Sequence, residues 1–326
     1  MTAREQTRIC AIVGPTAGGK TALSLAMADQ LRGEIVCCDS MQGYRGMDVG
    51  TAKPTPDERA VGPHHMLDVC DAGQSFSLAE YVTGAKSVIA EIHARGRLPI
   101  LCGGTGLYLD GVLFGGSFEQ TGNDGTVRAR LMALSEQPGG AQALYERLQA
   151  VDAESAAVIN PNNVKRVIRA LEIYESCGVP KSELDRASRQ AGMCYDACVL
   201  GLRYHDRDTL YRRIDVRVDM MLQAGLYGEV QRLLEQGIFD SNTTAAQAIG
   251  YKELLGVLRG ECSREQAEQQ LKTATRHYAK RQMTWCSAKP YVNWIYADDQ
   301  AGQMRPFSDI LAQAMDIWRA FVSDHK

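Results

Sequence analysis

The segment Ile9–Leu31 reads ICAIV-GPTAGGKT-ALSLAMADQL and gives the first indication of the fold class. Its five leading apolar residues predict a buried parallel strand, and its Ala- and Leu-rich end predicts a helix. A G-x-x-x-x-G-K-T loop between a strand and a helix points backbone N–H groups at an anion, with a lysine charge and a threonine hydroxyl for Mg²⁺ beside them. We therefore predict a diphosphate or triphosphate site, with Thr21 as metal ligand, formed by Gly14, Pro15, Thr16, Ala17, Gly18, Gly19, Lys20 and Thr21.

Length and composition place the chain among ordinary globular proteins. Its 326 residues suffice for a large core and a second domain. The formal net charge of -3 is mild and excludes no partner, because basic residues can still gather on one face. No apolar run is long enough to span a bilayer, and no apolar signal core precedes the first strand. The ten cysteines show no metal-binding spacing, so we expect reduced thiols and a cytoplasmic location.

Strand and helix patterns alternate over the first hundred residues. Strands are predicted at 34–38 and 98–102, and a helix at 78–95 with Ser77 as its N-cap. Such alternation predicts an α/β fold, a parallel sheet flanked by helices. Ligands bind at the carboxyl ends of such strands, so the phosphate loop, Asp39 and Thr105 should converge on one cleft.

The remainder of the chain is mostly helical. The glycine-rich stretch 115–125 predicts a linker, and residues 126–191 follow a helical pattern without an obvious strand. We expect an all-helical insertion domain at 121–198, between a first part of the core at 1–120 and its remainder at 199–326. In that remainder, strands are expected at 199–202 and 292–296, and helices at 208–224, 228–236, 251–259 and 264–287.

Asp39 follows its strand directly and has three interpretations. Beside a phosphate loop, its carboxylate can hold magnesium, as the second acidic element of nucleoside triphosphatases does. It can also act as the general base for a bound acceptor, or simply cap the next turn. The residues alone do not decide among the three.

Two groups of basic residues are candidates for nucleic-acid contact. Residues 269–297 contain no acidic side chain, and Lys272, Arg276 and Lys280 share one helix face, close to several aromatic residues. Such a stripe suits phosphates and splayed bases, although solvated basic faces are common. Lys165, Arg166 and Arg169 form a second cluster in the helical insertion.

Longer motifs carry a family resemblance. Asp39–Pro54 reads DSMQGYRGMDVGTAKP, and similar blocks lie at 103–108, 127–131, 165–172, 248–251 and 275–285. Together with the phosphate loop, these blocks resemble the tRNA dimethylallyltransferases from about residue 9 to residue 285. The chain departs from that family's pattern at Gly18, Gly43 and Cys286–Ser287, and its 115–125 linker lacks the usual proline-rich character.

The resemblance implies a monomeric transferase that moves a dimethylallyl group from dimethylallyl diphosphate to N6 of adenine 37 in a tRNA anticodon stem-loop. It implies Mg²⁺ as the cofactor, Lys20 and Arg217 as diphosphate ligands, Asp39 as base and Thr105 as a hydroxyl near the reacting atoms. The implied tRNA contacts are Asp39, Ser40, Met41, Gln42, Thr105, Arg128, Lys165, Arg166, Val167, Ile168, Arg169, Gln247, Ala248, Ile249, Gly250, Tyr251, Lys252, Lys280, Arg281, Gln282, Met283, Thr284 and Trp285.

Three other functions are compatible with part of the sequence. A small-molecule kinase that binds ATP accounts for the loop and Asp39, but leaves the block at 39–54 unexplained. An adenylate isopentenyltransferase, which modifies free nucleotides, needs neither basic cluster. A non-enzymatic RNA-binding protein does not need an intact Lys20–Thr21 pair.

Overall fold

The computed structural model describes residues 6–115, 125–240 and 244–324. The chain forms two compact units, one made of Met1–Leu109 and Tyr195–Lys326, the other of Asp110–Cys194. Most of the predicted linker, 116–124, lies outside the described residues.

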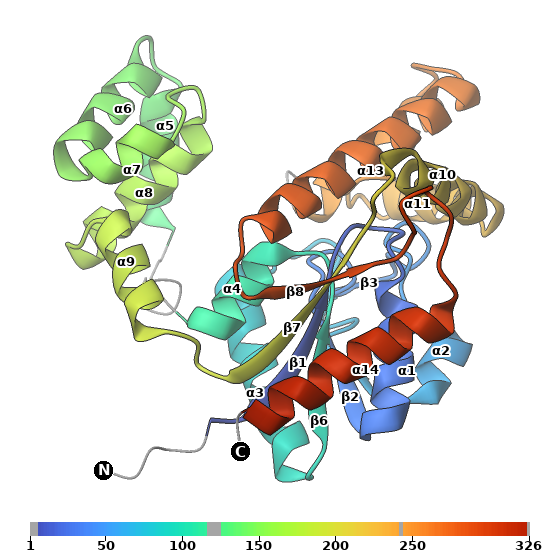
Figure 1. Cartoon of the computed structure of the whole chain (residues 1–326). Coiled ribbons are helices and arrows are strands. Elements are labelled where there is room, and N and C mark those ends of the chain that lie inside the picture. The colour runs from blue at the N-terminus through green and yellow to red at the C-terminus, as the bar shows by residue number, and fades with distance from the viewer. Residues whose placement is uncertain (1–5, 116–124, 241–243, 325–326) are drawn as a thin grey trace. The chain divides into compact units, whose positions relative to one another are not determined.

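The larger unit is built on a parallel sheet of six strands, in the order β4-β2-β6-β1-β7-β8 (Figure 1). Every neighbouring pair in it is parallel, and five of the six residues of β1 are buried. Burial on both faces explains why the strands are continuous apolar runs. The predicted α/β fold is therefore confirmed. The strands are β1 (Arg8–Val13), β2 (Gly33–Cys37), β4 (His64–His65), β6 (Leu98–Cys102), β7 (Asp196–Arg203) and β8 (Val292–Tyr296).

Helices cover both faces of this sheet (Figure 1). Helix α1 (Lys20–Leu31) and helix α14 (Phe307–Asp324) contact each other and share one core with the sheet. Helix α3 (Leu78–Ala94) packs against β2 and β6 from the opposite face. Ser77 caps α3 as predicted, and the Glu80 side chain completes a capping box.

A second layer of helices lies beyond the carboxyl ends of the strands (Figure 1). It has its own apolar core, in which Tyr44 and Met47 pack with helix α11 and Tyr251. The remaining elements of the larger unit are β3 (Tyr44–Arg45), α2 (Pro56–Val61), β5 (Cys70–Asp71), α10 (Arg207–Gln223), α11 (Leu226–Glu235), η1 (Ala245–Gln247), α12 (Lys252–Leu258) and α13 (Arg264–Ser287). Helix α4 (Gly106–Phe114) begins in the larger unit and continues into the smaller one.

The smaller unit is helical throughout its described part. Its core is apolar and includes Leu131, Leu144, Leu148 and Leu171, none of which is exposed. The helices are α5 (Thr126–Ser135), α6 (Gly140–Val151), α7 (Ala153–Val158), α8 (Val164–Cys177) and α9 (Lys181–Ala191). The chain returns to the sheet at Asp196, three residues before the predicted strand.

All ten cysteines are free thiols. Among the described helices, none combines the length and the apolar character that crossing a bilayer requires.

Candidate active site

The phosphate loop is shaped by backbone conformation and by three side chains from the later part of the chain. Gly19 has a φ of 94° and ends the loop at the N-terminus of α1, a conformation that favours glycine. Gln282 Oε1 accepts from Thr16 N at 2.8 Å, and Arg213 Nε donates to Ala17 O at 3.0 Å. The Tyr204 hydroxyl donates to Gly18 O at 3.4 Å. The loop is therefore braced before any ligand binds.

Two cations beside the loop are partly removed from water and form no ion pair with a described acidic side chain. Lys20 Nζ donates to the carbonyls of Gly14 and Pro15, at 3.1 and 2.7 Å. Burial lowers the pKa of Lys20, and Arg217 nearby lowers it further. Burial also lowers the pKa of Arg217, which Asp39 partly offsets. Neither forms an ion pair with a described acidic side chain, so the loop region is a strong site for an added anion.

Asp39 directs one carboxylate oxygen to the backbone and keeps the other available. Its Oδ1 accepts from the backbone N–H groups of Met41 and Gln42, at 2.9 and 3.4 Å. Its Oδ2 has no hydrogen-bond partner among the described residues, and Asp39 lines the same cleft as the phosphate loop. Oδ1 therefore caps the turn, as one of the three interpretations predicts, whereas Oδ2 can contact a ligand.

Thr105 lies next to this turn. Its hydroxyl accepts from Ser40 N at 3.0 Å, and its own N–H donates to Cys38 O at 3.2 Å. It contributes to a small pocket with Trp285, whereas Ser40 lines the large cleft. The phosphate loop and Asp39 line one cleft at the strand ends, as strand topology predicts, whereas Thr105 contacts Ser40 at its edge and lines the small pocket instead.

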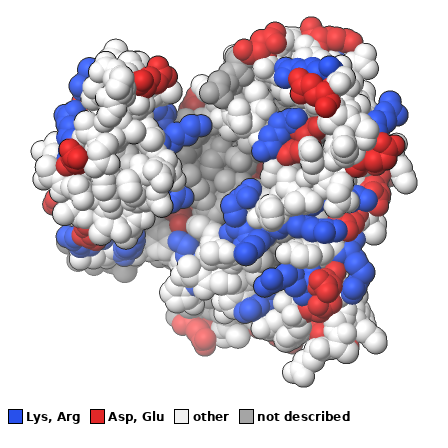
Figure 2. Space-filling view, turned by 90° about the horizontal axis from the view of Figure 1, so that it is seen from above, with Lys and Arg blue, Asp and Glu red and all other residues white. Residues whose placement is uncertain are grey.

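The cleft is a single large hollow of about 1720 Å³, and every residue lining it belongs to the larger unit. Lysine and arginine side chains gather over this region in the view down onto the second helical layer (Figure 2). The cations that line the cleft are Lys20, Arg45, Lys53, Arg59, Arg212, Arg213, Arg217, Lys252 and Arg281; the acids are Asp39, Asp48, Glu58 and Asp68.

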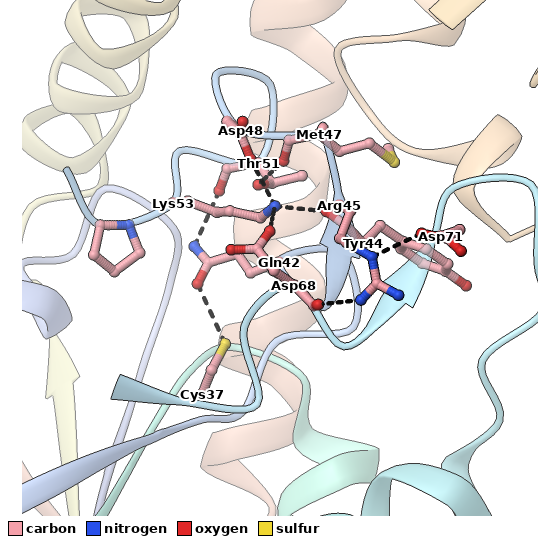
Figure 3. Close-up of polar contacts among 12 residues, drawn as sticks. Cys37, Gln42, Tyr44, Arg45, Met47, Asp48, Thr51, Lys53, Asp68 and Asp71 are labelled. Carbon is pink, nitrogen blue, oxygen red and sulfur yellow. Dashed lines mark hydrogen bonds and ion pairs between the residues drawn. The ribbon is translucent and has the colours of Figure 1, made fainter. Parts of the chain in front are cut away.

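The block at 39–54 is held together from inside (Figure 3). Lys53 is 7% exposed, and its Nζ donates to Tyr44 O, Asp48 and Asp68 at 2.5, 2.7 and 2.5 Å. The Gln42 amide donates to Thr51 O and Ala52 O, each at 3.1 Å, and accepts from the Cys37 thiol at 3.3 Å. Gln42 was predicted to contact tRNA, but the structure uses its amide to hold this block.

Glu229 secures the same block from helix α11, a role that sequence reasoning missed. Its carboxylate accepts from the backbone N–H groups of residues 48, 49 and 50 at 2.8 to 2.9 Å, and from the Tyr251 hydroxyl at 2.7 Å. The sequence feature that could have revealed this role is the position of Glu229 on the apolar face of α11, among Leu226, Val230 and Leu233. A glutamate on a buried helix face needs hydrogen-bond donors.

Tyr278 on α13 is a second residue that was missed. It lines the cleft, and its hydroxyl faces Thr105 and Gln282. Burial raises its pKa, and the nearby Asp39 carboxylate raises it further, so the phenol stays neutral at physiological pH. In the sequence, Tyr278 stands out only as one of the aromatic residues near the basic stripe.

The basic stripe predicted on α13 is partly neutralised by acidic side chains of a neighbouring helix. Lys272 Nζ lies 2.6 Å from Asp219 Oδ1, and Arg276 Nε lies 3.1 Å from Asp215 Oδ1. Helix α10 packs along α13, so its aspartates neutralise these two cations. Lys280 and Arg281 are exposed, and the Arg281 guanidinium lies over the Tyr278 ring at 5.6 Å.

Several other predicted tRNA contacts are buried. Ala248 and Tyr251 are 5% and 0% exposed and belong to the core of the second layer. Gln282 is 6% exposed, and Trp285 and Met283 are half-buried. Of the remaining predicted positions, the cleft is lined by Ser40, Met41, Gln247, Ile249 and Lys252 and not by Gly250, Lys280 or Thr284.

In the smaller unit, helix α8 presents some predicted residues and buries others. Val167 and Ile168 are 1% and 4% exposed in the apolar core, so their side chains are not an RNA surface. Lys165 and Arg166 are both exposed to solvent. Arg169 is 2.8 Å from the buried carboxylate of Glu172, and the exposed Arg128 is 3.9 Å from it.

Comparison with known proteins gives a consistent result. The IPP transferase family model matches residues 42–289, and the isopentenyl transferase model matches residues 7–62. A tRNA dimethylallyltransferase of Geobacillus thermodenitrificans is 47% identical over 292 residues, which is 90% of this chain and 91% of that protein. A solved tRNA isopentenylpyrophosphate transferase of Bacillus halodurans is 40% identical, with a TM-score of 0.72 over 98% of both chains. A eukaryotic dimethylallyltransferase captured acting on tRNA is 28% identical, with a TM-score of 0.80 over 98% of this chain and 80% of that chain.

Proposed function

The chain belongs to the IPP transferase family, and from that premise we propose that it transfers a dimethylallyl group from dimethylallyl diphosphate to N6 of adenine 37 in tRNA. One observation carries the proposal. In a single cleft, the half-buried cations Lys20 and Arg217 lie beside Asp39, a carboxylate with one available oxygen. The leaving diphosphate needs the cations, and the adenine amine needs the carboxylate.

The donor diphosphate binds at the N-terminus of α1. Lys20 and Arg217 neutralise the charge that grows on the leaving oxygen as the bond to carbon weakens. Because both cations are partly removed from water, their attraction for that charge is stronger than at a solvated surface. Diphosphate binding also favours the charged form of Lys20, opposing the burial that lowers its pKa.

The acceptor reacts by displacement at carbon. The adenine N6 lone pair is conjugated with the ring, so the amine is a poor nucleophile until it loses a proton. N6 forms a bond to C1 of the dimethylallyl group, the bond from C1 to the diphosphate oxygen breaks, and Asp39 Oδ2 accepts the N6 proton. The hydrogen bonds from Met41 and Gln42 to Oδ1 fix the orientation of that carboxylate.

Magnesium fits this site as a partner of the diphosphate. Among the described residues, no group of three His, Cys, Asp or Glu side chains forms a protein cage for a metal. That suits Mg²⁺, which usually binds through substrate phosphates and water with one or two protein oxygens. Thr21 is the cleft residue that would hold it, and it would supply charge neutralisation at the leaving group.

The acceptor base must leave the stacked anticodon loop to reach the cleft, at a cost of about a few kcal/mol. Contacts to the stem-loop backbone compensate for this cost. Cations at the surface that suit such contacts are Lys280 and Arg281 in the larger unit and Lys165 and Arg166 in the smaller one. One chain supplies the phosphate loop, Asp39 and Arg217, so the reaction as proposed needs no second copy.

One assay tests the proposal against its rivals. The protein is incubated with dimethylallyl diphosphate and Mg²⁺ together with tRNA, AMP or no acceptor, and the products are read by mass spectrometry. We expect a dimethylallyl mass increment on the nucleoside at position 37 of tRNA only. Prenylated AMP would indicate an adenylate isopentenyltransferase, and the absence of any prenyl product would reject the proposal.

A further inference from the structure

Helix α13 presents one face to the loops of the cleft. Tyr278, Gln282 and Trp285 lie at i, i+4 and i+7 and therefore on the same side of the helix. Tyr278 faces Thr105, and Trp285 shares a small pocket with Thr105 and Gly106. Gln282 lies between them, at the point where two loops approach the helix.

The Gln282 amide bonds to both loops at once. Its Oε1 accepts from Thr16 N in the phosphate loop at 2.8 Å, and its Nε2 donates to Gly104 O after β6 at 3.1 Å. These partners are 266 and 178 residues away in the chain. An amide supplies a carbonyl acceptor and an NH₂ donor side by side, whereas the equally long Glu, when ionised, only accepts and Met donates nothing.

The fit around this amide is tight. A Cβ built on Gly104 would lie 1.9 Å from Gln282 Nε2, so only glycine leaves room for the amide. Gln282 is 6% exposed, which leaves little of its surface for a macromolecule. The neighbouring Lys280 and Arg281 are exposed instead.

We propose that Gln282 is a positioning residue that fixes the phosphate loop against the Gly103–Thr105 loop, and thereby sets the spacing between the diphosphate and the acceptor-side groups. The inference rests on the proposed function, because it concerns the same donor and acceptor. It assigns Gln282 to the donor side of the reaction and removes it from the tRNA surface on which the family resemblance placed it.

The first test compares Gln282→Met with Gln270→Met, the same chemical change at an exposed position of α13. Removing the amide leaves Thr16 N and Gly104 O unpaired and lets the loop shift, which predicts a loss of about ten-fold to a hundred-fold in kcat/KM for dimethylallyl diphosphate. The tRNA Kd, measured by filter binding, should stay within about two-fold, because a buried side chain makes no phosphate contact. Gln270→Met should leave both quantities unchanged.

Lys280→Ala removes an exposed cation that does not line the cleft and provides the opposite pattern, a weaker tRNA Kd with an unchanged donor KM. If Gln282→Met behaves like Lys280→Ala, the inference is wrong. A second readout needs no catalysis: inorganic diphosphate with Mg²⁺ should raise the Tm of the wild type and of Gln270→Met by the same amount, but that of Gln282→Met by clearly less. Equal Tm increments in all three proteins would also reject the inference.

A double-mutant cycle keeps the test valid if Gln282→Met folds poorly. Gly104→Ala alone should impair donor kcat/KM, because the new methyl group displaces the Gln282 amide. In a Gln282→Ala background the same Gly104→Ala change should have little further effect, since the clashing atoms are gone. Additive losses would contradict the proposed contact. If the wild type transfers no prenyl group, the proposed function fails, whereas the diphosphate Tm measurement still reports on the loop.

Discussion

The basic residues of the two units are held in contrasting ways. In the larger unit, Lys20 and Arg217 are half-buried and form no ion pair with a described acidic side chain. In the smaller unit, Lys165 and Arg166 extend from α8 toward solvent. Desolvated cations act strongly on one charge at a fixed place, whereas solvated cations bind phosphates through counterion release and tolerate small shifts. The difference fits the roles we propose, the cleft for the transfer reaction and α8 for contacts to the RNA backbone.

The largest expected effect concerns the carboxylate between the two cleft cations. Asp39→Asn keeps the side-chain size but removes the proton acceptor, so single-turnover prenyl transfer should slow by roughly 10²–10⁴. The tRNA Kd should change far less, because the amide oxygen still accepts from Met41 N. A variant that turns over normally at saturating tRNA but binds it poorly would make Asp39 a recognition residue and break the comparison.

Next in size is the removal of a half-buried cation. Lys20→Ala should lower kcat by roughly 10²–10³, as expected when one donor to a developing negative charge is removed. Steady-state kinetics with saturating tRNA measure this loss. The salt dependence of tRNA binding is the control and should match that of the wild type. Near-normal transfer by this variant would show that the phosphate loop is not the donor site.

A smaller effect is expected from the solvated cations of α8. Lys165→Ala/Arg166→Ala should reduce the slope of log Kd for tRNA against log salt by about two, because each side chain neutralises one phosphate. Donor KM should stay the same. Arg169→Ala is a useful contrast, because it leaves the buried Glu172 carboxylate without its closest cation. It should lower the Tm instead, as removing one partner of a buried ion pair does. An unchanged slope in the double variant would remove α8 from the RNA surface.

The smallest effect concerns two aspartates, one in each unit. Partial burial alone would raise the pKa of Asp68, but hydrogen bonds and charge from Lys53 and Arg59 outweigh it and hold the pKa below 3.8. Burial would likewise raise the pKa of Asp152, but hydrogen bonds from Ser155 and Ser182 lower it. A folded-state pKa below the unfolded value gives stability that is present above about pH 4 and is lost as pH falls through the folded pKa.

Salt distinguishes the two cases. Raising ionic strength screens Lys53 and Arg59, so carboxyl-carbon NMR titration should show the Asp68 pKa moving up toward its ordinary value. The Asp152 pKa should move less, because neutral donors hold that carboxylate. Equal pKa shifts at Asp68 and Asp152 would mean that neighbouring cations contribute no more to the Asp68 pKa than neutral donors contribute to the Asp152 pKa.

The fold was predictable where local pattern and tertiary packing agree. Strand β6 and helix α13 have the predicted bounds, because apolar runs and capping residues mark them in the sequence. Helix α14 was missed, although Ile310, Ala314 and Trp318 recur at i, i+4 and i+8 and form its buried face. Strands of two residues, such as β3 and β5, are too short for any periodicity and depend on their partners.

Strand order predicts which segments lie together at the site, but it does not predict what each side chain does there. Strand order alone places the phosphate loop, Asp39 and Thr105 at one edge. Whether Gln42, Gln282 or Val167 faces solvent depends on contacts with residues far away in the chain, which a motif does not record. Lys272 and Arg276 illustrate the same limit, because the aspartates that neutralise them lie on another helix.

The chain enters and leaves the smaller unit through a closed neck. Cys194 N donates to Leu113 O at 2.6 Å, and Ser188 Oγ donates to Phe114 O at 3.2 Å. Segments that begin and end at one place can be lengthened, replaced or cut without rerouting the rest of the chain, since closing a longer loop costs little entropy. In evolutionary terms the helical unit is thus an exchangeable module. For protein engineering, the same neck is the natural place to graft a different domain onto an unchanged larger unit.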